Sequence, residues 1–229
     1  MREMVINCLL EVKELFDDND ISVFPLYGTL LGFIRDGGII DGDDDADVGA
    51  WYTEYDKIRN LEPILNKKGY VLLGSGMKYR NRIINIYPND GNNVFHIGII
   101  FFIRDRNNVI QMIMPDNNFI ERLGKRWNIE KTFLFKLANR VYRYLLLRKI
   151  LTNVYQGEWF DNFREIEIYG TIFNVFSKSD EYLVSKYGKA WQIKDNSWTR
   201  AKAVSLNKNY KKYKIQDKEV KKYWVNRAL

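Results

Sequence analysis

The sequence has very few residues that could cross-link the chain or bind a transition metal. It contains one cysteine, Cys8, and one histidine, His96, among 229 residues. A single cysteine excludes an internal disulfide framework and a zinc site built from cysteines. No internal repeat and no Pro- or Ser-rich linker divides the chain. We therefore expect one domain over residues 1–229, with a core at about 21–115 and a helical and hairpin part at about 116–229.

Long apolar runs are missing as well. The longest ones, at residues 94–103 and 144–147, fall well short of the roughly 20 residues that are needed to cross a bilayer. The chain does not open with the pattern of a signal peptide. These two absences predict a cytoplasmic location. A hydrophobic content of 46% is too high for a disordered chain and typical of a folded one.

The formal net charge of +7 is distributed unevenly. Asp residues concentrate between Asp36 and Asp47, whereas Lys and Arg crowd residues 122–149 and 200–227. Such a balance suits nucleotides, phosphorylated polymers, nucleic acid and anionic lipid headgroups, and it does not choose among them. Residues 131–151 mix aromatic and basic side chains at helical spacing. This predicts either a packing helix with a basic outer face or peripheral contact with an anionic membrane.

Hydrophobic spacing predicts alternating helices and strands. Helices are expected at residues 2–16, 30–35, 53–68, 130–151 and 179–187; strands are expected at 21–26, 46–51, 70–73, 80–87 and 94–103, with a possible one at 109–114 and a hairpin over 166–176. These elements predict an α/β (α+β) fold with an antiparallel or mixed sheet of about five strands flanked by helices. Lys78, Arg80 and Arg82 alternate along one strand, as a solvated face or as contacts to a diphosphate or anionic polymer.

The segment from Tyr27 to Gly49 combines two features that carry chemistry. Gly28 allows close approach of a ligand to the backbone, Thr29 adds a hydroxyl, and the start of the next helix offers unpaired N–H groups to an anion. Asp45 and Asp47 are two residues apart on a predicted strand, so their carboxylates project on the same face. Paired carboxylates next to a phosphate-binding turn predict a site for Mg²⁺ or Mn²⁺.

Two other interpretations of the acidic run compete with a catalytic metal site. Most acidic runs are solvated turns, and residues 41–45 could be one. The alternation of Asp41, Asp43 and Asp45 also resembles a calcium loop, but the glycine at the sixth position and the closing Glu are missing. Five aspartates in seven residues repel one another if they face a pocket, and a bound cation would relieve that repulsion. The Gly-Thr turn upstream favours the metal site.

The same segment resembles the signature of the LicD/fukutin-related family. The matching positions are Gly28-Thr29-Leu30-Leu31-Gly32, Arg35, Gly38, Ile40 and residues 43–47. A second stretch, Asp180-Glu181-Tyr182-Leu183 through Lys186-Tyr187-Gly188 and Trp191, is similar to the closing element of that family. Two ordered motifs are more specific than either one alone. The resemblance runs from about Ile21 to Trp198 and is poor in the middle third.

This resemblance implies a nucleotidyltransferase-like fold and a metal-dependent phosphotransferase. Such an enzyme moves phosphocholine, ribitol phosphate or glycerol phosphate from a CDP-linked donor to a hydroxyl of a cell-surface or lipid-linked glycan, with no obligate nucleic acid. Carried over by position, Asp45 and Asp47 are the catalytic metal ligands, and Gly28 and Thr29 bind the donor phosphates. Arg35 is either a phosphate anchor or a salt-bridge partner of the aspartates. Asp43 and Asp44 could add outer contacts, and the role of Asp41 is unassigned.

The sequence departs from the family pattern at one position of consequence. The resemblance implies a third carboxylate on a later strand, where this chain has Gly98. His96 lies on the same face of that strand and could serve as a ligand or a base, although a lone histidine is more often structural. Asp90 and Asp105 are the alternative carboxylates. The zinc-binding cysteines of some animal relatives are also absent.

Two rival functions stay open. One is a nucleotidyltransferase that transfers a nucleoside monophosphate and releases pyrophosphate. The other is a non-catalytic nucleic-acid-binding module, suggested by the basic and aromatic residues over 122–149 and 207–226. The second rival gives the aspartate cluster no role.

Overall fold

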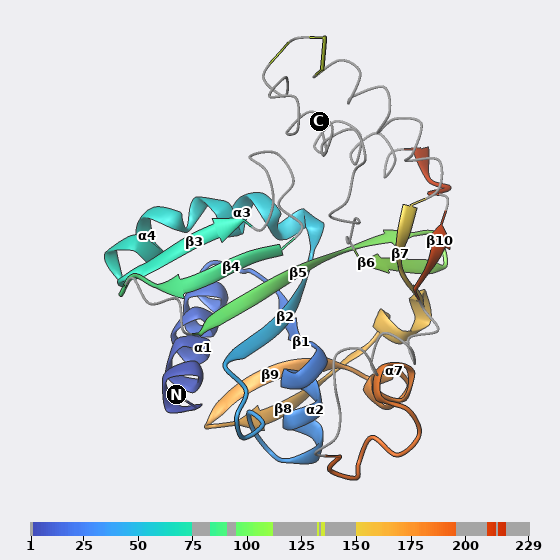
Figure 1. Cartoon of the computed structure of the whole chain (residues 1–229), viewed down its shortest axis with the longest axis horizontal. Coiled ribbons are helices and arrows are strands. Elements are labelled where there is room, and N and C mark those ends of the chain that lie inside the picture. Colours follow the sequence, from blue (N-terminus) through green and yellow to red (C-terminus); the bar gives the residue numbers. More distant parts are fainter. Residues whose placement is uncertain are drawn as a thin grey trace.

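The computed structural model describes residues 2–74, 83–90, 95–111, 132, 134–135, 150–195, 210–213 and 215–218. Its elements form a mixed sheet with helices packed on it, which confirms the predicted α/β class (Figure 1). In chain order the elements are α1 (Arg2–Asp17), β1 (Val23–Pro25), α2 (Tyr27–Arg35), β2 (Asp45–Trp51), α3 (Tyr55–Asn60), α4 (Glu62–Lys67), β3 (Tyr70–Gly74), β4 (Ile83–Pro88), β5 (His96–Asp105), β6 (Asn108–Gln111), β7 (Ile150–Gln156), β8 (Phe163–Ile168), β9 (Thr171–Phe176), α7 (Ser179–Tyr187) and β10 (Tyr210–Tyr213).

The main sheet has eight strands among the described residues, rather than the five expected. Its order is β1-β2-β5-β6-β7-β10, with β4 also paired to β5 and β3 paired to β4. Strands β2 and β5 run parallel, and their register places Asp45 beside His96 and Asp47 beside Gly98. Strand β4 runs antiparallel to β5 and places Asn85 beside Gly98 on the other side. Three residues of one row, Asp47, Gly98 and Asn85, therefore share a face of the sheet.

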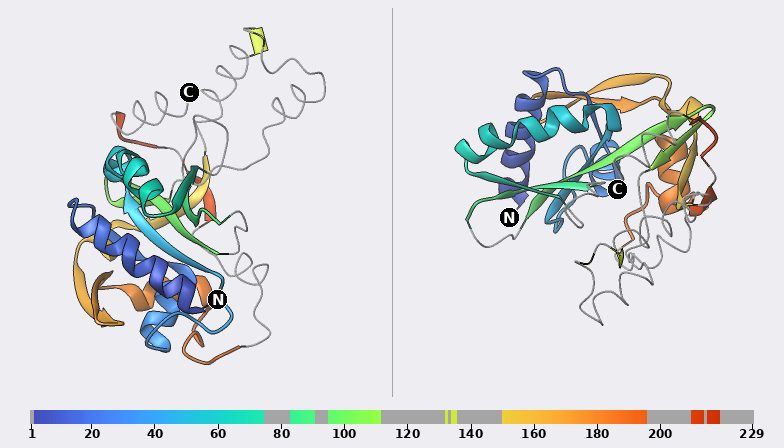
Figure 2. Two further views of the ribbon diagram at one scale, coloured as in Figure 1. Left: turned by 90° about the vertical axis from the view of Figure 1, so that its left-hand side faces the viewer. Right: turned by 90° about the horizontal axis from the view of Figure 1, so that it is seen from above.

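One face of the sheet is covered by α1. In β2 the residues Ala46, Val48 and Ala50 are buried, and they belong to the same core cluster as the apolar residues of α1. Helix α1 packs on β2 and β5, and Figure 2 shows it lying along the sheet from two further directions. The helix predicted at residues 2–16 is confirmed as α1, and its buried apolar residues recur with the helical period.

A second, aromatic cluster fills the opposite face near α2 and α7. The ring of Phe24 packs edge-on against Phe176 and Phe160, with centroids 6.0 Å and 5.9 Å away. Gly49 lies under the Phe24 ring, and any larger residue there would overlap it. Helix α2 packs on both β2 and α7, while the hairpin β8–β9 contacts β1. This arrangement brings the segment after α7 close to the start of α2.

Three predicted helices differ from the observed ones. Helix α2 begins at Tyr27 instead of Leu30, so the predicted turn is its first helical turn. The predicted helix at 53–68 is divided into α3 and α4, because proline is favoured only in the first turn of a helix and Pro63 starts a new one. The predicted helix at 130–151 lies almost wholly outside the described residues. Its last two positions, Ile150 and Leu151, are strand β7.

Other predictions are confirmed in part. The hairpin of β8 and β9 and helix α7 lie where they were expected. Gly69 ends α4 with a φ of 85°, as predicted for a glycine at a helix end. Lys78, Arg80 and Arg82 fall outside the described residues. Within the described part of the chain, no helix is both long and apolar enough to cross a membrane.

Candidate active site

Thr29 joins the start of α2 to the predicted catalytic strand. Its side chain is 3% exposed, and its Oγ1 accepts a hydrogen bond of 2.8 Å from the backbone N–H of Asp47. A second hydrogen bond joins the same two elements: the N–H of Leu26, just before α2, donates to the carbonyl oxygen of Asp47 at 2.9 Å. Thr29 was predicted to bind donor phosphate through its hydroxyl. In the structure that hydroxyl accepts from the backbone of Asp47, and its contact with a phosphate stays a prediction.

Asp45 and Asp47 occupy the positions that the strand period predicts. Both are half-buried, while Ala46 between them is fully buried on the other face of the sheet. The two carboxylates therefore project from the same face of β2. In the register of the sheet, His96 of β5 is paired with Asp45, and Gly98 is paired with Asp47. A Cβ atom at Gly98 would overlap Asp47 Oδ1, so a side chain at this position would displace the Asp47 carboxylate.

Asp43 lies next to Gly28, at the entrance to α2. A Cβ at Gly28 would stand 3.0 Å from Asp43 Oδ2, which leaves little room for any side chain but hydrogen. The pKa of Asp43 is raised to about 6, first by burial and then by the nearby charges of Asp45 and Asp44, while Arg35 lowers it. Repulsion between carboxylates in this turn is thus one part of the shift. A bound cation would relieve that repulsion.

Arg35 lies at the end of α2 and is bonded to its neighbour Asp36. Its Nη2 and Nε donate to the two Asp36 oxygens at 2.8 Å and 3.0 Å, and both side chains are largely buried, at 12% and 15% exposure. The hydrogen bond to Asp36 is the main reason that the pKa of Arg35 is raised. Lys194 Nζ lies 3.6 Å from the same Asp36 carboxylate. Asp36 thus links the end of α2 to the segment that follows α7.

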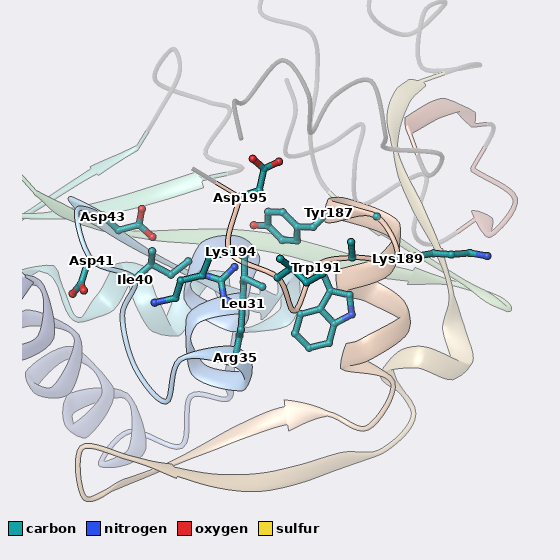
Figure 3. A pocket seen from close by; sticks show the side chains of 14 residues that line it. Leu31, Arg35, Ile40, Asp41, Asp43, Tyr187, Lys189, Trp191, Lys194 and Asp195 are labelled. Atoms are coloured by element: carbon teal, nitrogen blue, oxygen red, sulfur yellow. The ribbon is translucent and has the colours of Figure 1, made fainter. Parts of the chain in front are cut away.

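A pocket of about 900 Å³ opens between α2 and the segment that follows α7. Gly28 and Arg35 line it from α2, and Asp43 lines it from the acidic turn. The opposite wall is formed by residues 187–195, including Tyr187 and Lys194. Figure 3 shows that these two walls face the same space. The two sequence motifs, far apart in the chain, therefore meet at one cavity.

Tyr187 lines this pocket and is influenced by the charge of Asp47 on β2. Burial raises the pKa of its hydroxyl above the ordinary value, and the negative charges of Asp47 and Asp43 contribute to the shift. The sequence motif had indicated residues 187, 188 and 191, but it did not indicate that they face Gly28. Lys194 had no sequence signal at all.

The three alternatives for a further metal ligand are placed differently. Asp105 is fully buried and accepts hydrogen bonds from the Tyr213 hydroxyl and from the N–H groups of Gln216 and Asp217, all at 2.8 Å. It lies seven residues beyond Gly98 on β5, or about 23 Å along a strand. Asp90 is exposed beyond the end of β4. His96 stacks on Tyr87 at 5.0 Å between centroids, beside Asp45.

A hard divalent cation fits the donor atoms that the site offers. Among the described residues, no group of three or more His, Cys, Asp and Glu side chains could hold a metal. Mg²⁺ does not need one, because it takes one or two carboxylates and completes its shell with water and substrate phosphate oxygens. Asp45 and Asp47 supply such a pair. The charges of Asp45 and Asp44 also repel the Asp43 carboxylate, and a cation here would relieve that repulsion.

Comparison with known families decides the relationship of this chain. A family model described as the LicD/FKTN/FKRP nucleotidyltransferase domain matches residues 20–147. The chain belongs to the LicD family. The match spans α2, the acidic turn and β2 to β6, so the predicted site residues of this LicD protein all lie within it. The second wall of the pocket, at residues 187–195, lies beyond it.

Two individual proteins are similar to this LicD-family chain. An uncharacterized protein of Rickettsia prowazekii, RP689, is 34% identical over 62 residues, which make up 27% of this chain and 23% of that protein. The chain thus matches less than a quarter of that relative's length. A crystal structure of the lincosamide antibiotic adenylyltransferase LnuA with lincomycin bound covers 89% of this chain and 94% of its own, at 15% identity and a TM-score of 0.45.

Proposed function

We propose that this LicD-family transferase moves a phosphorylated alcohol from a CDP-linked donor to a hydroxyl group of a glycan. The observation that carries the proposal is the meeting of both motif segments at one pocket, which is lined by Asp43, two residues before Asp45 at the start of β2. A volume of about 900 Å³ is within the range of pockets that hold nucleotide-sized ligands. Cationic and aromatic side chains in its wall suit a phosphorylated ligand with a flat ring.

Each residue of the pocket has a separate part in this proposal. The backbone at Gly28, in the first turn of α2, approaches the donor phosphates where helix N–H groups point outward. Arg35 and Lys194 add positive charge on the same side. Thr29 holds the Asp47 backbone and so fixes the carboxylate of that residue. Tyr187 lies between the phosphates and the β2 carboxylates, and the ring offers a surface for the donor.

Asp45 and Asp47 would hold Mg²⁺ or Mn²⁺ in this proposal. The bound cation would neutralise the charge that develops on the transferring phosphoryl group. The acceptor hydroxyl oxygen attacks the phosphorus that carries the alcohol, the bond from this phosphorus to the bridging oxygen breaks, and CMP leaves with the bonding electrons. A nearby carboxylate or His96, which lies beside Asp45, takes the hydroxyl proton.

The first prediction tests donor class and carboxylate roles together. Incubation with a panel of CDP-alcohols, Mn²⁺ and a glycan acceptor is expected to release CMP, measured by chromatography. Asp45→Asn and Asp47→Asn should each reduce the rate by about a hundredfold or more, because the carboxylate pair supplies several kcal/mol of charge stabilisation. Asp18→Asn, an exposed aspartate at the end of α1, is the matched control and keeps the wild-type rate.

Other products would point to the rivals. Release of pyrophosphate from a nucleoside triphosphate, with no CMP from any CDP-alcohol, assigns the protein to nucleotidyl transfer. Full activity of the double variant of Asp45 and Asp47 rejects the assignment of these residues. A salt-dependent shift of nucleic acid in a gel, combined with no binding of divalent ions, favours the nucleic-acid-binding module.

A further inference from the structure

Asn85 on β4 has a side-chain oxygen that the fold leaves without a hydrogen-bond partner. Among the described residues, Glu54, Asn85 and Tyr182 each have one buried polar atom of this kind. Glu54 Oε2 is compensated, since it lies 3.0 Å from Lys57 Nζ. Asn85 Oδ1 has no such charge partner among the described residues. A buried amide oxygen without a donor costs about 1–3 kcal/mol, so its retention requires a reason.

The orientation of the Asn85 amide is fixed from behind. Asn85 Nδ2 donates to the hydroxyl oxygen of Tyr87 at 3.1 Å. The Tyr87 ring in turn stacks on His96, with an interplanar angle of 27°. The nitrogen side of the amide is therefore held by a packed ring pair, and the oxygen side points elsewhere.

Asn85 Oδ1 points toward the catalytic aspartate across a glycine. Strand pairing puts Asn85 and Asp47 on either side of Gly98, on the same sheet face. The position that a Gly98 Cβ would take lies 3.8 Å from Asn85 Oδ1 and in overlap with Asp47 Oδ1. Asp47 Oδ1 and Asn85 Oδ1 therefore both border the small space that a side chain at Gly98 would fill.

These distances allow the two oxygens to share one cation. They place Asp47 Oδ1 and Asn85 Oδ1 no more than about 6 Å apart. Mg²⁺ binds oxygen at about 2.0–2.1 Å and holds two of its ligands roughly 3–4 Å apart, so a bound ion would draw the two side chains together. An amide oxygen is a hard, neutral donor that binds such ions as carboxylates do. Gly98 has no side chain that could supply an oxygen, and Asn85 reaches the same space from the next strand. The acidic cluster alone would not justify a third ligand, but the orphaned amide oxygen does.

We propose that Asn85 Oδ1 is the third protein ligand of the divalent cation held by Asp45 and Asp47. This inference rests on the proposed function, because it assumes that the aspartate pair binds the metal. In this ligand set a neutral oxygen takes the place of a third carboxylate, so the protein ligands carry two negative charges instead of three. The cation is then held weakly by the protein alone and more firmly once donor phosphate oxygens complete its shell.

The second prediction concerns Mn²⁺ binding to the full chain, measured by titration with electron paramagnetic resonance. Asn85→Ala is expected to weaken binding by about tenfold or more, a loss typical of removed metal-site groups. The number of water molecules on the bound Mn²⁺, obtained from water-proton relaxation, rises by one. Asn85→Asp restores a third carboxylate and binds Mn²⁺ at least as tightly as wild type. Asn174→Ala, at an exposed position of β9, is the control and leaves binding unchanged.

The outcomes separate this inference from the proposed function. If Asn85→Ala binds Mn²⁺ like wild type while Asp47→Asn does not, the aspartate site stands and Asn85 is not a ligand. If Asp47→Asn also binds normally, both assignments fail. If the Asn85 variants behave as expected but no CDP-alcohol releases CMP, the ligand set stands and the donor assignment fails. Should Asn85→Ala not fold, the isosteric Asn85→Asp decides the question, since weaker binding than wild type overturns the proposal.

Discussion

Lys186 is a charged residue at a position that is almost closed to water. Its side chain is 5% exposed, and burial lowers its pKa to about 7. The rings of Tyr27, Tyr155 and Tyr182 surround the ammonium group, with centroids at 5.1, 5.3 and 5.7 Å. Attraction to the ring faces offsets part of the cost of burying the charge. The remaining cost reduces the stability of the folded protein at neutral pH.

The third prediction uses the pH dependence of that cost. Since the folded pKa is about 7 and the unfolded pKa is about 10.4, the unfolded chain binds more protons between these values. Stability therefore rises with pH across this window, and the full cost is present below pH 7. Lys186→Met is expected to stabilise the protein at pH 6 by up to a few kcal/mol. The gain should shrink as pH rises toward 10.

Chemical denaturation at several pH values measures this difference. Lys67→Met, at an exposed position of α4, serves as the control and changes stability by less than about 0.5 kcal/mol. A variant at Lys186 that gains nothing at pH 6, or whose gain does not depend on pH, would contradict the buried-charge interpretation.

The individual site residues also show what the sequence can and cannot predict. Asp45 and Asp47 were placed on one face correctly, because the strand period of two is a local property. The gap at Gly98 was visible in the motif. Asn85 was not, because its position beside Gly98 depends on the register between β4 and β5, which no local pattern records. The same is true of Lys194, whose place depends on tertiary packing.

Among the elements, the hairpin of β8 and β9 has a contact that reaches the loop before the acidic turn. At its tip, Tyr169 accepts a hydrogen bond of 2.7 Å from the backbone N–H of Ile39. Its ring occupies the space beside Gly38, where any Cβ would overlap it. Ile39 is 1% exposed, so water cannot replace the hydroxyl. The hairpin thus fixes the path of the chain from α2 into the acidic turn.

The fourth prediction removes this contact. Tyr169→Phe leaves the N–H of Ile39 buried without its partner and is expected to destabilise the protein by about 1–3 kcal/mol. Urea denaturation gives the free energy of unfolding. Gln216→Ala is the control: it removes the hydrogen bond that Arg106 Nη1 donates to Gln216 Oε1, 3.0 Å long and exposed, where water takes over. An equal loss in both variants would show that burial does not decide the cost.

Element boundaries were predicted less well than element types. The pattern indicated a helix after Gly28, but not that it begins at Tyr27, because Leu26 provides no side-chain cap to mark the start. Spacing alone did not reveal the break between α3 and α4, although Pro63 carries that information. The first two residues of β7, Ile150 and Leu151, were expected to end a helix, since apolar residues of a strand can also match the helical period.

At the scale of the whole molecule, the charge pattern is the feature that connects the chain to its surroundings. The net charge is +7, while the acidic turn supplies Asp41 and Asp43 to the pocket. A basic protein with an acidic pocket can approach an anionic surface and still hold a cation inside. Peripheral contact with an anionic inner membrane leaflet remains a prediction, because residues 136–149, which would carry it, lie outside the described residues. The expectation of a single domain also remains a prediction.

The fifth prediction tests that contact by flotation with lipid vesicles. At low salt the protein is expected to float with vesicles rich in anionic lipid and to remain below with neutral ones. Each Lys or Arg near the surface contributes about 1 kcal/mol, and added salt screens it. Joint replacement of Arg140, Arg143 and Arg148 by Ser should reduce flotation. The control replaces Lys67, Lys68 and Lys178, which are exposed positions in or next to α4 and before α7. No binding to anionic vesicles at low salt removes the proposal.

The pocket that joins α2 to the segment following α7 has a consequence for protein synthesis. The N-terminus of a chain leaves the ribosome first, so Gly28 and Arg35 emerge well before Tyr187 and Lys194. At about 5–20 residues per second, the roughly 150 residues between the two walls take about 8–30 s to appear. Until then, the nascent chain has one wall of the pocket and lacks the other. A ligand that needs both walls therefore cannot be held in this cavity before residues 187–195 have been made.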